Sequence, residues 1–122
     1  MKMLSTKWFK KWSTKVGLSD LELVAAIHDL TLGLSTADLG SNLFKVRIKR
    51  KHGGKSGGFR TIVVYKQNDR AIFLYGFSKN ERDNIDKSEL QLFKTLGNDF
   101  LELNAKQLEQ SIAQSVLFEL EE

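Results

Sequence analysis

The sequence predicts an α+β fold in which helices at both ends of the chain pack against a small antiparallel sheet of three to four strands. Apolar residues recur at helical spacing before residue 32 and after residue 86. Between them, runs of alternating, β-branched and aromatic residues predict strands at about 44–50, 59–66 and 70–79. The order of helices, strands and helices is typical of the α+β class. With 122 residues, we expect one domain spanning 1–122.

Two helices are expected in the first third of the chain. Ser5 or Thr6 can cap the first, which ends at Gly17, and a capping box of Ser19 with Glu22 begins the second at about 20–31. On the first helix, one face carries an apolar stripe that we interpret as core, formed by Trp8, Phe9, Trp12 and Val16. On the second helix, His28 has no partner at metal-ligand spacing, so we interpret it as a partly buried structural histidine. Residues 1–4 can supply a short first strand.

The remaining elements follow from similar signals. Residues 33–42 are rich in Gly, Ser and Thr and are interpreted as a connector. The short link between 59–66 and 70–79 predicts an antiparallel hairpin. Capping patterns begin a third helix at about 87–103 and a fourth that ends near residue 114, and alternation at 116–120 predicts a terminal strand or tail.

Charge is unevenly distributed along the chain. Residues 1–66 carry 13 Lys and Arg against 4 Asp and Glu, whereas residues 67–122 carry 6 against 11. The excess of positive charge in residues 1–66 therefore suggests an anionic partner on one side of the molecule. Cysteine is absent, which excludes disulfides and thiolate metal sites. No signal peptide or membrane-spanning segment is recognisable, so we expect a cytoplasmic protein that does not contact membrane.

The most informative stretch is a basic strand followed by a glycine-rich loop. From residue 44 to 49, apolar residues alternate with Lys45, Arg47 and Lys49, which places the three cations on one face of a strand. Further cations follow through and beyond the loop, namely Arg50, Lys51, Lys55 and Arg60. Such a row suits a polyanion with repeated phosphates, although a solvated edge strand gives the same pattern.

A second basic segment should converge on this stretch. In an antiparallel hairpin, Arg60 near the start of one strand lies close to Lys79 near the end of the next, and Arg82 follows. This convergence favours a binding site over a solvated face. The Gly-Lys-Ser sequence at 54–56 is not a phosphate-binding P-loop, because residue 49 is lysine and a strand follows. No clustered carboxylates or histidines suggest a metal site, and no cofactor is expected.

Two segments carry a resemblance to a known family. Residues 57–65 (GGFRTIVVY) and 73–85 (FLYGFSKNERDNI) resemble the RelE/ParE superfamily of toxins from bacterial type II toxin–antitoxin modules, most closely its RelE- and HigB-like branch. The resemblance covers nearly the whole chain. It implies a compact toxin that cleaves mRNA, typically on the ribosome, by attack of a ribose 2′-hydroxyl on the adjacent phosphate without a metal. It also implies a cognate antitoxin, often a helix-turn-helix protein that binds operator DNA.

The resemblance assigns roles to the basic residues. Arg60 matches the arginine that contacts the scissile phosphate, and Lys45 with Lys79 are its expected catalytic companions. The expected RNA-binding residues are Arg47, Lys49, Arg50, Lys51, Lys55 and Arg82. Two positions depart from the family pattern: residue 80 is asparagine where many relatives have arginine, and residue 86 is aspartate where the best-known branch has a proton-transferring tyrosine. The general base and acid therefore stay open among the lysines and His52.

Two alternatives remain beside an endoribonuclease. The same cationic sheet fits a nucleic-acid-binding module without catalysis, and ParE relatives poison gyrase instead of cleaving RNA. The rich basic strand favours RNA over gyrase.

We predict that binding to single-stranded RNA weakens steeply with salt. The basic stretch offers about four to six phosphate contacts, and each contributes about −0.7 to the slope of log affinity against log salt for single strands. Affinity measured between low and physiological salt checks this. A flat response contradicts the electrostatic basis of the site.

Overall fold

The computed structural model describes residues 1–50 and 58–121. The predicted RNA-binding residues Lys51 and Lys55, and the candidate His52, lie outside these ranges. The helices and strands, in chain order, are β1 (Lys2–Thr6), α1 (Lys7–Lys15), α2 (Asp20–Thr31), β2 (Thr36–Gly40), β3 (Leu43–Ile48), β4 (Phe59–Lys66), β5 (Arg70–Ser78), α3 (Lys87–Glu102), α4 (Ala105–Ala113) and β6 (Leu117–Glu119).

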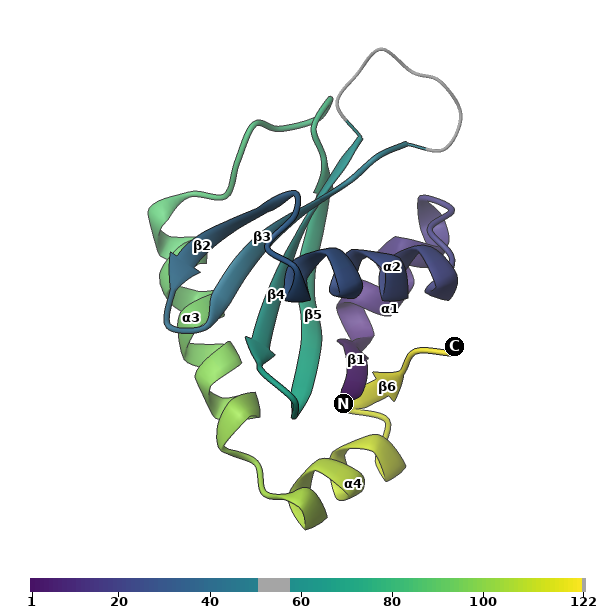
Figure 1. Ribbon diagram of the computed structural model, residues 1–122, viewed down its shortest axis with the longest axis vertical. Coiled ribbons are helices and arrows are strands. Elements are labelled where there is room, and N and C mark those ends of the chain that lie inside the picture. Colours follow the sequence, from purple (N-terminus) through teal and green to yellow (C-terminus); the bar gives the residue numbers. More distant parts are fainter. Residues whose placement is uncertain (51–57, 122) are drawn as a thin grey trace.

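The strands form one mixed sheet in the order β2-β3-β4-β5-β1-β6 (Figure 1). The α+β class and the β4–β5 hairpin are confirmed. The expectation of three to four antiparallel strands was wrong, because the sheet has six strands and β1 runs parallel to β5. β1 lies between β5 and β6, so segments from both ends of the described chain are neighbours at one edge of the sheet.

β2 lies in the segment interpreted as a connector. It pairs antiparallel with β3, and Gly40 lies opposite Leu43 across a two-residue loop. The loop residues Ser41 and Asn42 have φ values of 55° and 62°. Positive φ at both central residues is the geometry of the tight turn that suits the twist of a β-hairpin. The connector interpretation was therefore wrong over residues 36–40.

Each face of the sheet has its own hydrophobic core. Helices α1 and α2 cover one face, where Phe9, Leu23 and Ile27 pack on Val63 and Phe73. Helix α3, followed by α4, covers the other, where side chains such as Phe93 and Leu108 join the core around β4, β5 and β1 (Figure 1). Burial on both faces explains why β4 and β5 are apolar along most of their length. No helix in the described ranges is long and apolar enough to cross a membrane.

Local capping signals correspond closely to the helix starts. Thr6 caps α1, and complete capping boxes begin α2, α3 and α4.

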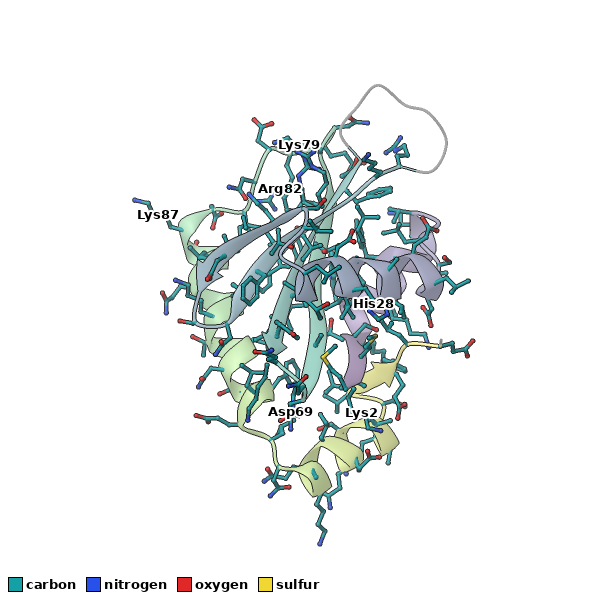
Figure 2. The ribbon with its side chains drawn as sticks, viewed as in Figure 1. Lys2, His28, Asp69, Lys79, Arg82 and Lys87 are labelled. Atoms are coloured by element: carbon teal, nitrogen blue, oxygen red, sulfur yellow. The ribbon has the colours of Figure 1, made fainter. Side chains whose placement is uncertain are left out.

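Two side chains differ from expectation. His28 is exposed, because it lies on the outward side of α2, and the prediction of a partly buried histidine was wrong (Figure 2). Trp8 belongs to the predicted core stripe, yet 48% of its surface is exposed.

The pairing of β4 with β5 contains a register shift. Val63 lies opposite Phe73 whereas Ile62 lies opposite Tyr75, so Leu74 is an extra residue in β5. Such a bulge breaks the strict alternation of side chains. Leu74 and Tyr75 consequently both contribute to the core on the α3 side.

Gly76 follows this bulge and faces helix α1. A Cβ atom at residue 76 would collide with the ring of Trp12, approaching its Cζ3, Cη2 and Cε3 atoms. Trp12 also meets Phe59 edge-on at 5.7 Å and Phe9 at 5.4 Å between ring centroids. The absence of a side chain at residue 76 therefore allows α1 to lie close against β5.

We predict that Gly76→Ala destabilises the fold by about 1–3 kcal/mol, as overpacking of a core typically does. The cause is the Trp12 ring, so a double-mutant cycle is the matched control. In a Trp12→Leu background, adding Gly76→Ala should cost much less than in the wild type. Free energies of unfolding from denaturant titration measure both differences. Equal costs in the two backgrounds would show that the ring is not the cause.

Candidate nucleic-acid interface

The α3-side face of the sheet is left uncovered near the start of β4. Helix α3 packs over Ile62 and Val64. Arg60 lies two residues before Ile62, hence on the same face, and is only partly buried. On the neighbouring strand, Lys45 lies opposite Ile62 and Arg47 lies opposite Arg60. Two strands thus present three cations on one open part of the sheet.

These cations border a shallow hollow of about 390 Å³. Its lining consists of Ser35, Thr36, Ala37, Lys45, Arg47 and Arg60. The first three come from the start of β2 and the residue before it, in the segment that the sequence did not identify as a strand. The backbone N–H of Arg47 donates to the Ser35 carbonyl at 2.9 Å, which fixes this rim against β3. The hollow is therefore formed by paired strands.

Arg47 and Arg60 influence each other electrostatically. Burial, and secondly the positive charge of Arg47, lower the pKa of the Arg60 guanidinium below its ordinary value. Arg60 Nη1 also donates to the carbonyl of Phe59 at 3.3 Å. Like charges directly opposite on adjacent strands destabilise a sheet. An anion between the two guanidinium groups would relieve that repulsion, and a planar guanidinium can donate two hydrogen bonds to one phosphate.

Lys45 and Lys79 each contact the segment between β5 and α3. Lys45 Nζ donates to Asn84 Oδ1 at 3.4 Å, and Lys79 Nζ donates to the carbonyl of Asp83 at 3.0 Å. Lys79 Nζ also lies 3.7 Å from the Asp83 carboxylate. The two lysines approach the hollow from β3 and from the end of β5. Lys79 and Arg82 lie near the same end of the molecule (Figure 2).

The guanidinium group of Arg82 donates hydrogen bonds to neighbouring residues of the protein. Its Nη2 and Nη1 atoms donate to the two carboxylate oxygens of Glu89 at 2.6 and 3.0 Å, and Nη1 also donates to the Tyr75 hydroxyl at 3.1 Å. Its Nε and Nη2 atoms donate to the carbonyl of Asn84 at 3.1 and 2.8 Å. These bonds raise the pKa of Arg82 and lower that of Glu89, for which the Arg82 hydrogen bond is the largest cause. This geometry suits a residue that positions the segment from Lys79 to Asp86 against α3.

A sequence comparison identifies the family. The profile of the family described as the RelE toxin of the RelE/RelB toxin–antitoxin system matches residues 1–120.

The chain belongs to the RelE toxin family.

A search of curated proteins found no match. Membership confirms the resemblance stated from residues 57–65 and 73–85, and it makes the protein a toxin of a toxin–antitoxin system with a cognate antitoxin as partner.

The other predicted site residues of this RelE family toxin lie in different places. Lys49 is exposed just beyond β3. Arg50 lies on the opposite face of the sheet, since its Nη2 donates to Ser78 Oγ at 3.4 Å and its Cζ lies 5.3 Å from the centre of the Phe59 ring. The structure thus brings Lys45, Arg47 and Arg60 together, with Lys79 and Arg82 at the margin. Arg50 is not part of that group.

Sequence reasoning missed three contributors to the RelE toxin's site region. Asn84 accepts a bond from Lys45, and its carbonyl accepts from Arg82. Tyr75 reaches Arg82 only because of the bulge in β5. The rim at residues 35–37 depends on recognising β2, for which the tight turn at residues 41–42 was the available signal. Within 1–50 and 58–121, no group of three or more His, Asp or Glu side chains could hold a metal ion.

We predict that Glu89→Gln makes the RelE toxin less stable at neutral pH but flattens its response to acid. The pKa of Glu89 is lowered from its ordinary value of 4.5, so its stabilising contribution is present above that pH and is lost as pH falls. Glutamine can still accept the Asp86 N–H of the capping box, so the change removes the charge and one hydrogen bond from Arg82 but keeps the cap. Melting temperatures between about pH 7 and pH 3 test this.

The control is Glu102→Gln, at the other end of α3, where the exposed side chain accepts a bond from Asn98. It should melt within about a degree of the wild type near neutral pH, as exposed substitutions usually do. If Glu89→Gln follows the wild-type curve throughout, the ion pair with Arg82 does not stabilise the fold.

Proposed function

We propose that this RelE family toxin is an endoribonuclease that cleaves mRNA on the ribosome and thereby inhibits translation. The observation that carries the proposal is the direct opposition of Arg47 and Arg60 beside Lys45 in one open hollow. Two guanidinium groups facing each other from adjacent strands suit a phosphodiester, whose negative charge neutralises their repulsion. Family membership supports the same reading, because RelE toxins are generally ribonucleases.

The reaction that fits this site is an internal transesterification. The ribose 2′-oxygen forms a bond to the adjacent phosphorus while the bond from phosphorus to the 5′-oxygen breaks. A base takes the 2′-hydroxyl proton, and an acid gives a proton to the departing 5′-oxygen, which leaves a cyclic phosphate and a 5′-hydroxyl end. Arg60 and Arg47 stabilise the extra negative charge on the phosphate oxygens in the transition state.

Lysines are the proposed proton carriers. Among the described residues, the lining of the hollow contains Lys45 but no histidine or carboxylate. Lys79 is the first residue after β5, and its backbone N–H donates at 3.0 Å to the carbonyl of Gly58, two residues before Arg60. Arg82 has a positioning role, since it fixes the segment that bears Lys79 and Asn84. The proposed antitoxin is a helix-turn-helix DNA-binding protein, and the proposed site of action is the cytoplasm.

A second candidate is a nucleic-acid-binding module without catalysis. The same absence of histidine and carboxylate from the lining of the hollow favours it. Tightly controlled expression, growth curves and mapping of mRNA ends separate the candidates. New 5′-hydroxyl ends with growth arrest support cleavage. RNA binding without new ends supports the binding module, and DNA damage signalling without mRNA cleavage supports a gyrase-directed toxin.

We predict that Arg60→Ala abolishes growth arrest and lowers the cleavage rate about 10²–10³-fold, the usual loss for one transition-state donor. Arg60→Lys should restore only part of the rate, because the charge returns without the planar fork. Arg47→Ala should resemble Arg60→Ala. Rates from single-turnover cleavage of mRNA on ribosomes provide the measurement.

Lys106→Ala is the matched control, because Lys106 is an exposed cation on α4, far along the chain from the hollow. It removes the same charge and should cleave at the wild-type rate. Thermal melts establish that each variant is folded. An Arg60→Ala protein that melts normally and cleaves at the wild-type rate removes the basis for the catalytic assignment.

A further inference from the structure

Trp8 is a large exposed aromatic side chain that the proposed mechanism does not use. It is the second residue of α1, and 48% of its surface is exposed. Its ring stacks on Tyr75 at 4.6 Å with an interplanar angle of 26°. Tyr75 in turn stacks on Phe93 at 5.1 Å. The indole is therefore the exposed end of an aromatic stack anchored in the core.

This stack adjoins the arginine pair. The Tyr75 hydroxyl accepts a bond from Arg82, and the Tyr75 ring lies 6.3 Å from that of Phe77. Phe77 is the cross-strand partner of Arg60. Ring contacts from Trp8 to Tyr75 and from Tyr75 to Phe77 therefore link the indole to the strand position opposite Arg60.

Cations flank the indole on α1. Lys11 follows Trp8 by three residues and so neighbours it on the helix surface, and Lys15 lies about one further turn along the same side. Both lysines are exposed. The sequence of α1 contains no acidic residue. Proteins that bind single-stranded nucleic acid combine an exposed aromatic ring with nearby basic side chains, because every base has a face that can stack.

We propose that Trp8 is a base-stacking platform for the RNA whose phosphate binds between Arg47 and Arg60. Lys11 and Lys15 contact the phosphates that flank the stacked base. This inference rests on the proposed function, and it adds a residue that selects unpaired RNA with an accessible base. The rigidity of the stack supports the role, since a ring already held by Tyr75 loses little freedom when a base binds.

Trp8→Ala should weaken binding of a short single-stranded RNA about 5- to 150-fold, which is the fold-change for loss of one base–aromatic stack. A 2′-O-methyl group at each position of the RNA blocks the attacking 2′-oxygen and so prevents cleavage during the titration. Trp8→Phe should retain part of the affinity. Leu21→Ala, an exposed apolar residue on α2, is the matched control and should bind like the wild type.

Tryptophan fluorescence gives a readout that a merely structural role would not move. The protein has two tryptophans, and Trp8→Phe retains Trp12 alone. The RNA should quench the wild-type protein, an oligonucleotide of equal length with abasic sugars should quench it much less, and Trp8→Phe should lose the quenching. Melting curves confirm that both Trp8 variants are folded.

Two results overturn the inference, and they are distinguishable. In the first result, the RNA binds the wild type, Arg60→Ala weakens that binding, and the Trp8 variants bind with wild-type affinity while Trp8→Phe is still quenched by RNA. The stacking role of Trp8 is then wrong, and the arginine site is retained. If the wild type binds neither oligonucleotide, the proposed function fails and the platform with it.

Discussion

The register shift in β5 is the constraint on which the site region depends. With strict alternation from Phe73, residues 75 and 77 would face helices α1 and α2. The extra residue, Leu74, turns Tyr75 to the α3 side, beside Phe93 and Arg82. It also turns Gly76 toward Trp12, where any side chain would collide. One inserted residue thus allows α1 to pack closely against β5. It also places the ring of Tyr75 on the face of the sheet that carries Arg47 and Arg60.

Two arginines of this protein make structural contacts, and two others border the proposed site. Arg70 is buried, with Nε bonded to Asp69 at 3.0 Å and Nη1 to the carbonyl of Phe100 at 2.9 Å, so it ties β5 to the end of α3. Arg82 ties the segment after β5 to the start of α3. Arg47 and Arg60 instead face each other across two strands. Since the surrounding strands hold both backbones, the two side chains stay close despite their repulsion, and the site is preorganised for an anion.

Much of the fold could be predicted because its signals are local. Capping boxes predicted three helix starts, because the residues of each box lie within one turn of the helix. The pairing of Arg47 with Arg60 was within reach, because both flank the same glycine-rich loop of a hairpin. The parallel pairing of β1 with β5 was not, because it joins residues about 70 apart through backbone bonds that no side-chain pattern records. The bulge could not be predicted for a similar reason. Because β5 is apolar on both faces, a change in the alternation of its side chains does not alter the apolar pattern of the sequence.

The position of β1 between β5 and β6 has a consequence for how quickly the chain folds. Residues 2–6 are synthesised before all their partners, yet they pair with Arg70 to Phe73 and with Leu117 to Glu119. Loop closure over such separations costs entropy before any contact repays it, and proteins rich in distant strand pairs fold in milliseconds to seconds rather than microseconds. The β3–β4 hairpin, which bears both site arginines, requires only local pairing. The elements of the site can therefore form early, whereas the edge of the sheet that carries β1 and α1 is completed last.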